Sequence, residues 1–193
     1  MKKILVSAAF AAAIFAPSAA IAQSVPAAVI AVVDLDKVTG SCNACRTASA
    51  ALQSQVAAYK SHQQTLATPL QAEERSIQTA IDALGGKAPD AALKARVEAF
   101  QNKQQADAQT LSREEDTIRR NQAYIQQQIS TKLGPIYQQV MQRRGANMMV
   151  EISNTLQSSA SLDVSNDVLA ALNTSLPTIQ TTAPAGAAQP QGR

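Results

Sequence analysis

The sequence predicts an α+β fold that is mostly helical, in which a small β base carries a long antiparallel, coiled-coil-like helical hairpin. Two short segments, residues 29–33 and 148–152, have the β-branched or alternating patterns of strands. Between them, residues 42–144 repeat apolar side chains in steps of three and four, which is typical of helices with one narrow buried stripe. The sequence LGGKAPD at residues 84–90 divides this stretch, because it combines a helix end with a helix start.

Residues 1–22 predict a secretory signal peptide. Lys2 and Lys3 form a basic start, and the apolar run that follows is too short to span a bilayer. Residues 20–22 have the small-x-small pattern of a cleavage site. We therefore expect an exported, soluble mature chain that begins at Gln23.

The charge and composition of the mature chain exclude some functions. Of the 17 basic residues, Lys2 and Lys3 leave with the signal peptide, so that 15 remain against 14 acidic residues. This near balance gives no electrostatic basis for nucleic-acid binding. The chain has three Phe, three Tyr and no Trp, so large rings are too few to fill a compact core. Long helices with narrow seams are favoured instead.

The predicted base, residues 28–41 and 145–173, holds the two strands. We expect Thr39-Gly40-Ser41 to end the first strand segment, with Ser41 as the N-cap of the long helix that follows. Ser165 is the expected N-cap of a short final helix in which Val168, Leu169 and Leu172 face inward. The alternation of side chains predicts that the core of this oligomerisation base consists of Val29, Ala31, Val33, Met148, Val150 and Ile152.

The predicted arm, residues 42–144, consists of two helices of roughly 40 and 50 residues, with the tip near residues 85–89. Pro69 predicts a kink or a short break near Thr68, and Gly134-Pro135 predicts a bend near the end of the second helix. Residues 174–193 contain few apolar side chains and are expected to form a disordered tail.

One such subunit has too little sheet to close a core by itself. Two or three short strands with exposed edges are marginally stable and pair readily with other strands. We therefore expect the chain to associate with copies of itself through the base.

The two ends of this arrangement resemble the Skp/OmpH family of periplasmic chaperones. The resemblance lies in the first strand, IAVVDLDKV, and in the end GANMMVEISNTLQSSASLDVSNDVLAALN. Within that end, the step Asp163-Val164-Ser165 and the segment 167–173 match the family's pattern. The likeness covers roughly residues 29–173, although the arm could match any coiled coil.

The resemblance implies a homotrimer whose base is a small barrel of strands from three subunits, with three hairpins around a cavity. It also implies that the protein holds unfolded outer-membrane proteins in the periplasm without ATP and delivers them for insertion. Relatives are strongly basic, whereas this mature chain is almost neutral. We therefore assign no lipid-binding residue and expect at most peripheral contact with the membrane.

Phe100 is the one large ring of its type that remains after processing, and it lies on the second arm helix. We consider it a candidate client contact, together with Leu93 and Val97 on the same helix. Phe100 could equally hold the two helices of the hairpin together, and both interpretations stay open.

Cys42 and Cys45 are the only cysteines and lie three residues apart. Haem attachment requires a histidine after the second cysteine, where the chain has Arg46, and a tetrahedral zinc site requires four ligands, where the chain adds only His62. A redox-active pair at a helix start, a local disulfide and unpaired packing cysteines remain. We favour the disulfide.

No catalytic, cofactor-binding or metal-binding residues are predicted, and the protein is not expected to be an enzyme. Two alternatives to the holdase hypothesis remain: an envelope scaffold whose hairpin binds a folded partner, and a thiol-disulfide protein that uses Cys42 and Cys45. The cavity of a holdase suits clients of many sequences, because many weak contacts demand no single one.

Overall fold

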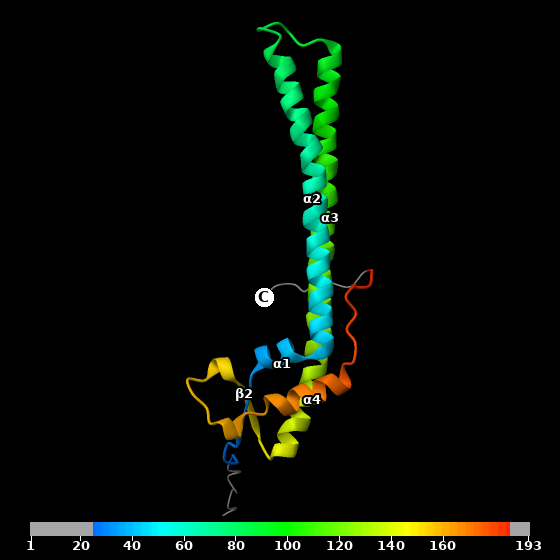
Figure 1. Ribbon diagram of the computed structural model, residues 1–193. Coiled ribbons are helices and arrows are strands. Elements are labelled where there is room, and N and C mark those ends of the chain that lie inside the picture. Colours follow the sequence, from blue (N-terminus) through cyan, green and yellow to red (C-terminus); the bar gives the residue numbers. More distant parts are fainter. Residues whose placement is uncertain (1–24, 186–193) are drawn as a thin grey trace, which may run out of the picture.

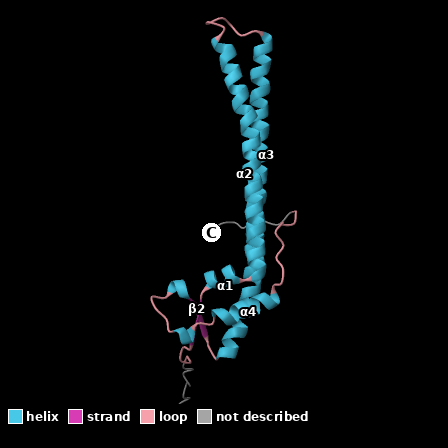
Figure 2. Cartoon of the chain, in the orientation of Figure 1, coloured by secondary structure: helices cyan, strands magenta, loops and turns pink. Residues whose placement is uncertain are grey.

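Two long antiparallel helices form an arm that rises from a small base (Figure 1, Figure 2). The computed structural model describes residues 25–185, so the predicted signal peptide at residues 1–22 and the mature start at Gln23 lie outside the described residues. Helix α2 (Asn43–Asp82) has 40 residues and helix α3 (Ala91–Arg144) has 54. Within residues 25–185, no helix is both long and apolar enough to traverse a bilayer.

The ends of the arm helices follow from local sequence signals. Asp90 caps α3, because its side chain accepts a hydrogen bond of 2.7 Å from the backbone N–H of Leu93. Gly85 and Gly86 form the tip with positive φ angles of 58° and 88°. Gly145 ends α3 in the left-handed conformation, directly after two arginines whose charge suits a helix C-terminus.

Both arm helices continue through their prolines. Pro69 lies inside α2 and Pro135 lies inside α3, and neither interrupts its helix. The short break that was one of the two expectations near Thr68 is therefore wrong, whereas a kink there and a bend at Gly134-Pro135 stay predictions. Both prolines are exposed, as are the residues four positions earlier, Thr65 and Thr131, so water can reach the carbonyls that lose a partner.

Strand β1 (Ile30–Val33) pairs in parallel with strand β2 (Met148–Glu151), in a register that sets Ile30 opposite Met148. A parallel pair requires a crossover connection, and the whole arm serves as that connection. Asn147 closes the lower end of the pair, since its side chain accepts from the Val29 N–H at 2.8 Å and donates to the Ala27 carbonyl at 2.7 Å. The two ends of the arm are thereby held together.

The first strand is shorter than predicted. Asp34 caps a separate helix α1 (Leu35–Ser41), accepting from the Lys37 N–H at 2.8 Å. Thr39, Gly40 and Ser41 are therefore helical rather than the end of a strand segment, and the N-cap of α2 is Cys42 instead of Ser41. The cap at Asp34 starts a helix directly after the β-branched residues of β1.

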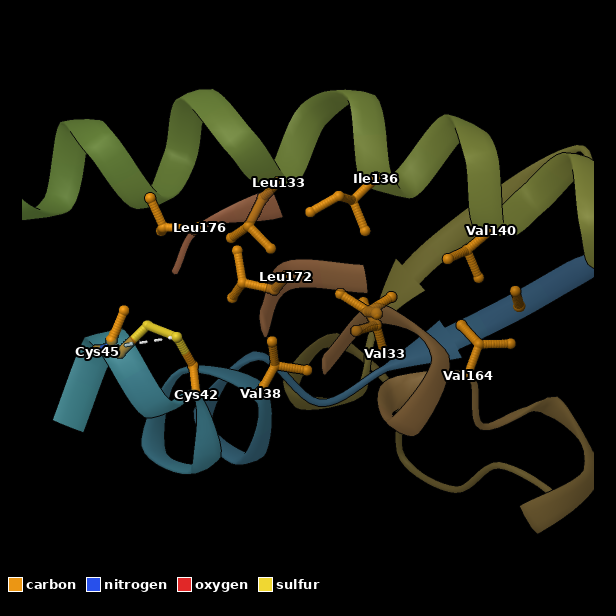
Figure 3. Packing of buried hydrophobic residues seen from close by; sticks show 13 residues of the cluster. Val33, Val38, Cys42, Cys45, Leu133, Ile136, Val140, Val164, Leu172 and Leu176 are labelled. Atoms are coloured by element: carbon orange, nitrogen blue, oxygen red, sulfur yellow. Dashed lines mark hydrogen bonds between the residues drawn. A yellow bond between two sulfur atoms is a disulfide. The ribbon is translucent and has the colours of Figure 1, made fainter. Parts of the chain in front are cut away.

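The hydrophobic core lies where β1, α1 and the first turn of α2 meet the last turns of α3 and helix α4 (Ser165–Ser175) (Figure 3). As predicted, Val168 and Leu172 of the final helix point inward, and both are fully buried. Leu133, Ile136 and Val140 of α3 complete the cluster with Val38 and Cys42. The last turns of α3, which the sequence assigned to the arm, therefore pack in the base.

The six predicted core residues of the base have three different environments. Ala31 and Val33 are buried, and Val150 is half-buried. Val29, Met148 and Ile152 are exposed in the single chain, and Ile152 belongs to a short 3-10 helix (Ile152–Asn154). Val32, which was not among the six, is buried as well, and α4 packs against β1. Burial of the exposed three in an oligomer stays a prediction.

The step Asp163-Val164-Ser165 joins the final helix to the first strand. It follows a second short 3-10 helix (Ala160–Leu162). The Val164 N–H donates to the Val32 carbonyl at 2.9 Å, and the Asp34 N–H donates to the Ser165 hydroxyl, also at 2.9 Å. Ser165 is the first residue of α4 rather than its N-cap. Its N–H and hydroxyl both donate to the Asp163 carboxylate.

The C-terminal segment differs from the prediction of a disordered tail for residues 174–193. Thr174 and Ser175 end α4, Leu176 is buried in the core and Ile179 packs against it. Residues 180–183 then run beside the arm, bonded to it. The prediction is wrong for residues 174–183, because two apolar anchors suffice to hold this short segment. Residues 186–193 lie outside the described part.

The pKa of Asp163 gives the base a specific acid sensitivity. The hydrogen bonds from the Ser165 side chain and backbone, and Lys37 at 3.8 Å, hold the pKa of this carboxyl below its usual value. A lowered pKa in the folded state means that the ionised carboxylate stabilises the fold above the unfolded-state pKa, and that this contribution is lost as the pH falls through the folded-state value.

We predict that Asp163→Asn lowers the urea midpoint of unfolding at pH 7. Its difference from the parent should begin to shrink below about pH 4, where the carboxyl of the unfolded chain takes up a proton, and should be lost as the pH falls through the lower folded-state pKa. Urea titrations at several pH values measure this. Asp36→Asn is the control, since no described hydrogen bond uses that side chain. A difference that is the same at pH 7 and pH 3 would contradict the assigned role of Asp163.

Candidate functional site

The candidate site is the surface of the arm, because the seam between its helices is thin. From residue 53 to residue 120, Ile77 is the one buried residue, and it is still 7% exposed. The other apolar positions of the seam are half-exposed. Such a surface retains apolar area that a ligand can cover, without a packed core beneath it.

The three predicted client contacts lie on α3 near the tip of the arm. Leu93, Val97 and Phe100 are all half-buried. Each therefore shares its surface between the other helix and solvent, which is compatible with both interpretations of Phe100. Their role as client contacts stays a prediction.

Polar side chains bridge the two helices where the apolar seam is interrupted. Arg96 donates to both carboxylate oxygens of Glu73, at 2.6 and 2.9 Å, and to the Ser76 hydroxyl at 2.7 Å. The hydrogen bond lowers the pKa of Glu73 and raises the pKa of Arg96. Because both groups are solvent-exposed, solvent screens the pair, and its main effect is to set the register of α2 against α3.

Further down the arm, His62 and Glu114 face each other across the hairpin, with 2.9 Å between the His62 Nδ1 and a Glu114 carboxylate oxygen. They line an open groove of about 750 Å³ with Tyr59, Ile118 and Asn121. His62 therefore contacts the other arm helix, although its side chain remains 40% exposed. Within residues 25–185, no cluster of three potential metal ligands accompanies it.

Three neutral amide side chains of the arm were not identified from the sequence: Gln55 and Asn121, which line this groove, and Gln128, which lies beyond it. Asn121 is 4% exposed and donates to the Gln55 side chain at 2.8 Å. Gln128 lies two turns further along α3. The glutamine-rich composition of the arm was the available signal, but it is also typical of a solvated helix face. Asn121 lies in the seam, whereas its neighbour Gln122 is exposed.

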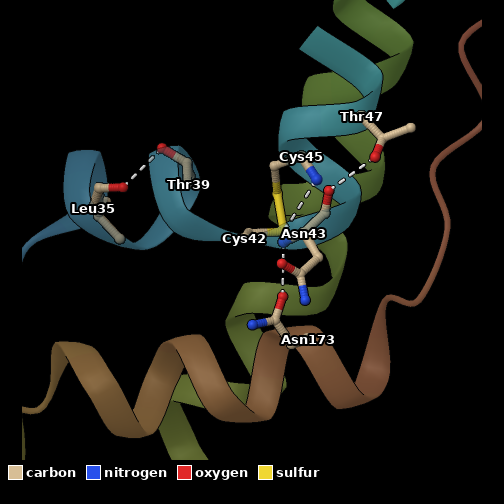
Figure 4. Close-up of a disulfide and its surroundings, with 7 residues drawn as sticks. All are labelled: Leu35, Thr39, Cys42, Asn43, Cys45, Thr47 and Asn173. Carbon is tan, nitrogen blue, oxygen red and sulfur yellow. Dashed lines mark hydrogen bonds between the residues drawn. A yellow bond between two sulfur atoms is a disulfide. The ribbon is translucent and has the colours of Figure 1, made fainter. Parts of the chain in front are cut away.

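Cys42 and Cys45 form a disulfide at the start of α2, where the arm leaves the base (Figure 4). Both residues are buried, and Cys42 belongs to the base core beside Val38. Asn43 is bonded at this point to the final helix, since its N–H donates to the Asn173 side chain at 2.9 Å. The disulfide lies where it can fix the direction of the arm, and its burial shields it from external thiols.

The fold and the site define a class of protein: a helical hairpin that offers an extended binding surface and is anchored on a small mixed base. A family model described as "Outer membrane protein (OmpH-like)" matches residues 29–172. The chain belongs to this OmpH-like family. The family consists in general of non-enzymatic outer-membrane chaperones that act in the periplasm, and membership supports a role in handling outer-membrane proteins.

A solved structure has a similar fold. It is the crystal structure of a candidate OmpH-like outer membrane chaperone from Caulobacter crescentus CB15, with a TM-score of 0.66 and 15% sequence identity. The match covers 84% of this chain and 95% of that chain. At this identity the likeness concerns the fold alone. No curated protein matches the chain.

We predict that reduction of the disulfide lowers the stability of the base by about 2 kcal/mol or less, because the bond closes a very short loop. Urea titration with and without a reducing agent measures the change. The double variant Cys42→Ala/Cys45→Ala serves as the control, since the reductant should not affect it. An unchanged midpoint after complete reduction of the parent would contradict a stabilising disulfide.

Proposed function

We propose that this chain is an ATP-independent periplasmic holdase. In this proposal three copies join through their bases into a homotrimer with a small β barrel, and their arms enclose a space that receives unfolded outer-membrane proteins. The proposal refines the general chaperone role that family membership supports.

The observation that carries the proposal is the exposed apolar surface of the base. Of the eight large hydrophobic residues that are exposed in the described chain, six belong to the base: Val29, Ile30, Met148, Ile152, Leu156 and Leu162. They surround a sheet of only two strands, in which β1 pairs with β2 on one side and bridges Asp163. A sheet this small with exposed apolar neighbours is stabilised by strands from other copies.

The surface of the arm suits an unfolded client. Precursors of outer-membrane barrels alternate apolar and polar residues and aggregate in water. The half-exposed apolar seam and the amide groups of the arm offer many weak contacts, and such contacts shield a client without selecting one sequence. Leu93, Val97 and Phe100 are the contacts that we propose near the tip.

Release in this proposal requires no nucleotide. Weak contacts are broken when a downstream folding machine or the membrane competes for the client. The near-neutral charge of the mature chain supports clients held mainly through apolar and amide groups, with at most peripheral contact with lipid.

Thiol-disulfide exchange finds less support as an alternative. Cys42 is fully buried and Cys45 is 7% exposed, so an external thiol cannot reach either sulfur without opening the base. On the holdase proposal, alanine at both positions leaves protection of clients unchanged.

We predict that Met148→Glu converts the trimer into smaller species and removes protection of clients. Met148 lies on β2 and is 47% exposed in the single chain, so a carboxylate there is tolerated by one subunit but is buried and unpaired when strands join. Sedimentation equilibrium measures the mass, and light scattering after dilution of a urea-unfolded barrel protein measures the protection.

Ile81→Glu is the matched control, because Ile81 is 41% exposed but lies on the arm. This variant should keep the mass of a trimer. Far-UV circular dichroism confirms that both variants keep their helices. A parent chain that sediments as a monomer, or that leaves the aggregation of the barrel protein unchanged, would overturn the proposed function.

A further inference from the structure

The segment that follows Ile179 lies against the arm, although it does not pack in the core of the base. After Leu176 and Ile179 have anchored it, the chain continues for residues 180–183 beside α2 and α3 (Figure 1). We refer to residues 180–183 as the strap. The strap adds no buried residue to the core, yet four hydrogen bonds hold it.

All four bonds join a neutral amide side chain of the arm to a backbone atom of the strap. Gln128 binds Gln180 twice, accepting from its N–H at 3.0 Å and donating to its carbonyl at 2.8 Å. Gln55 donates to the Thr181 carbonyl at 3.2 Å. Asn121 accepts from the Ala183 N–H at 2.8 Å.

The four hydrogen bonds contact the backbone of the strap and none of its side chains. Among the described hydrogen bonds, none uses a side chain of the strap, so a different sequence could make the same four contacts. The reciprocal pair at Gln128 reproduces the N–H and carbonyl pairing of a β ladder, which is how extended peptides add to a strand. The ligand that fits is therefore any extended polypeptide.

The site is built into the arm rather than created by the strap. Asn121 is 4% exposed with the strap in place, and its bond to Gln55, which lies within the arm, orients its side chain towards the strap. Without the strap, the Asn121 oxygen loses its described partner. The groove of about 750 Å³ begins at Thr182 and continues past Asn121 towards His62 and Glu114, so there is room beyond the strap.

We propose that Gln55, Asn121 and Gln128 form a binding site for extended, non-native polypeptide, and that the strap occupies this site as a competitor within the same chain. The identification of the competing ligand as an unfolded client rests on the proposed function. A tethered competitor has a high effective concentration and therefore lowers the apparent affinity for any external peptide. The strap sets how tightly a client is held.

The first test uses a fluorescent synthetic peptide with the sequence of residues 177–185 as the probe. The receptor is either the full mature chain or a chain that ends at Ile179, which keeps both apolar anchors of the base. We expect the shortened chain to bind the peptide at least tenfold more tightly by fluorescence anisotropy. In that chain, Gln128→Leu should abolish the gain, whereas Gln127→Leu, an exposed neighbour on α3, should not.

A second test leaves the length of the chain intact. Gln180→Pro removes the N–H that donates to Gln128, and Thr182→Pro removes an N–H that takes part in no described hydrogen bond. We expect the first variant to bind the probe peptide several-fold more tightly than the parent and the second to bind like the parent. Equal affinities of the shortened and full chains, or equal effects of Gln128→Leu and Gln127→Leu, would overturn the proposal.

The outcome is separable from that of the proposed function. If the full chain protects a barrel protein but the affinity for the peptide does not change when the strap is removed, the proposed binding site is wrong and the proposed holdase function stands. If the peptide binds the shortened chain as expected but no chain protects a client, the site stands as a self-binding site and its assignment to clients is overturned.

Discussion

The parallel pairing of β1 with β2 is the constraint on which the rest of the structure depends. It joins Ile30 to Met148, two residues that are separated by the entire arm. Parallel strands cannot be connected by a tight turn, so a long connection has to leave the base and return. Here that connection is a helical hairpin, and its two ends are held side by side by the pairing and by Asn147. The arm therefore projects from the base as a consequence of the strand topology.

The small core of the base makes the projection stable. Helices α1 and α4 and the last turns of α3 bury Val38, Val140 and Leu172, and the step at Asp163 ties α4 to β1. The remaining length of the arm contributes almost nothing to this core and is free to act as a surface. A small packed base with exposed apolar edges, joined to a long half-exposed arm, is compatible with the proposed binding of unfolded chains.

Much of this architecture could be predicted from the sequence. The two arm helices, their tip at the glycine pair and the inward residues of α4 follow from periodicity and from cap residues, which are local signals. Helix α1 was missed because it follows the β-branched run of β1 directly, and only the cap at Asp34 reveals the change of structure. The break at Pro69 was wrong because an exposed helix tolerates the lost hydrogen bond.

The strap and the site that Gln55, Asn121 and Gln128 form for it could not be predicted, since they depend on contacts between residues far apart in the chain. Thr, Pro and Ala around Ile179 indicate disorder when they are considered alone. Gln55, Asn121 and Gln128 look like solvated residues of a polar helix until the strap is placed beside them. The cysteines illustrate the opposite case: a short spacing limits the geometry, so a local disulfide was already among the few interpretations.

The most direct test of the central claim is native mass spectrometry of the mature chain mixed with one urea-unfolded outer-membrane barrel protein. The account predicts a complex whose mass equals three subunits and one client, together with a free trimer. A spectrum that contains only single subunits, or trimers that never carry the client, would contradict a holdase that assembles through its base and receives the client between its arms.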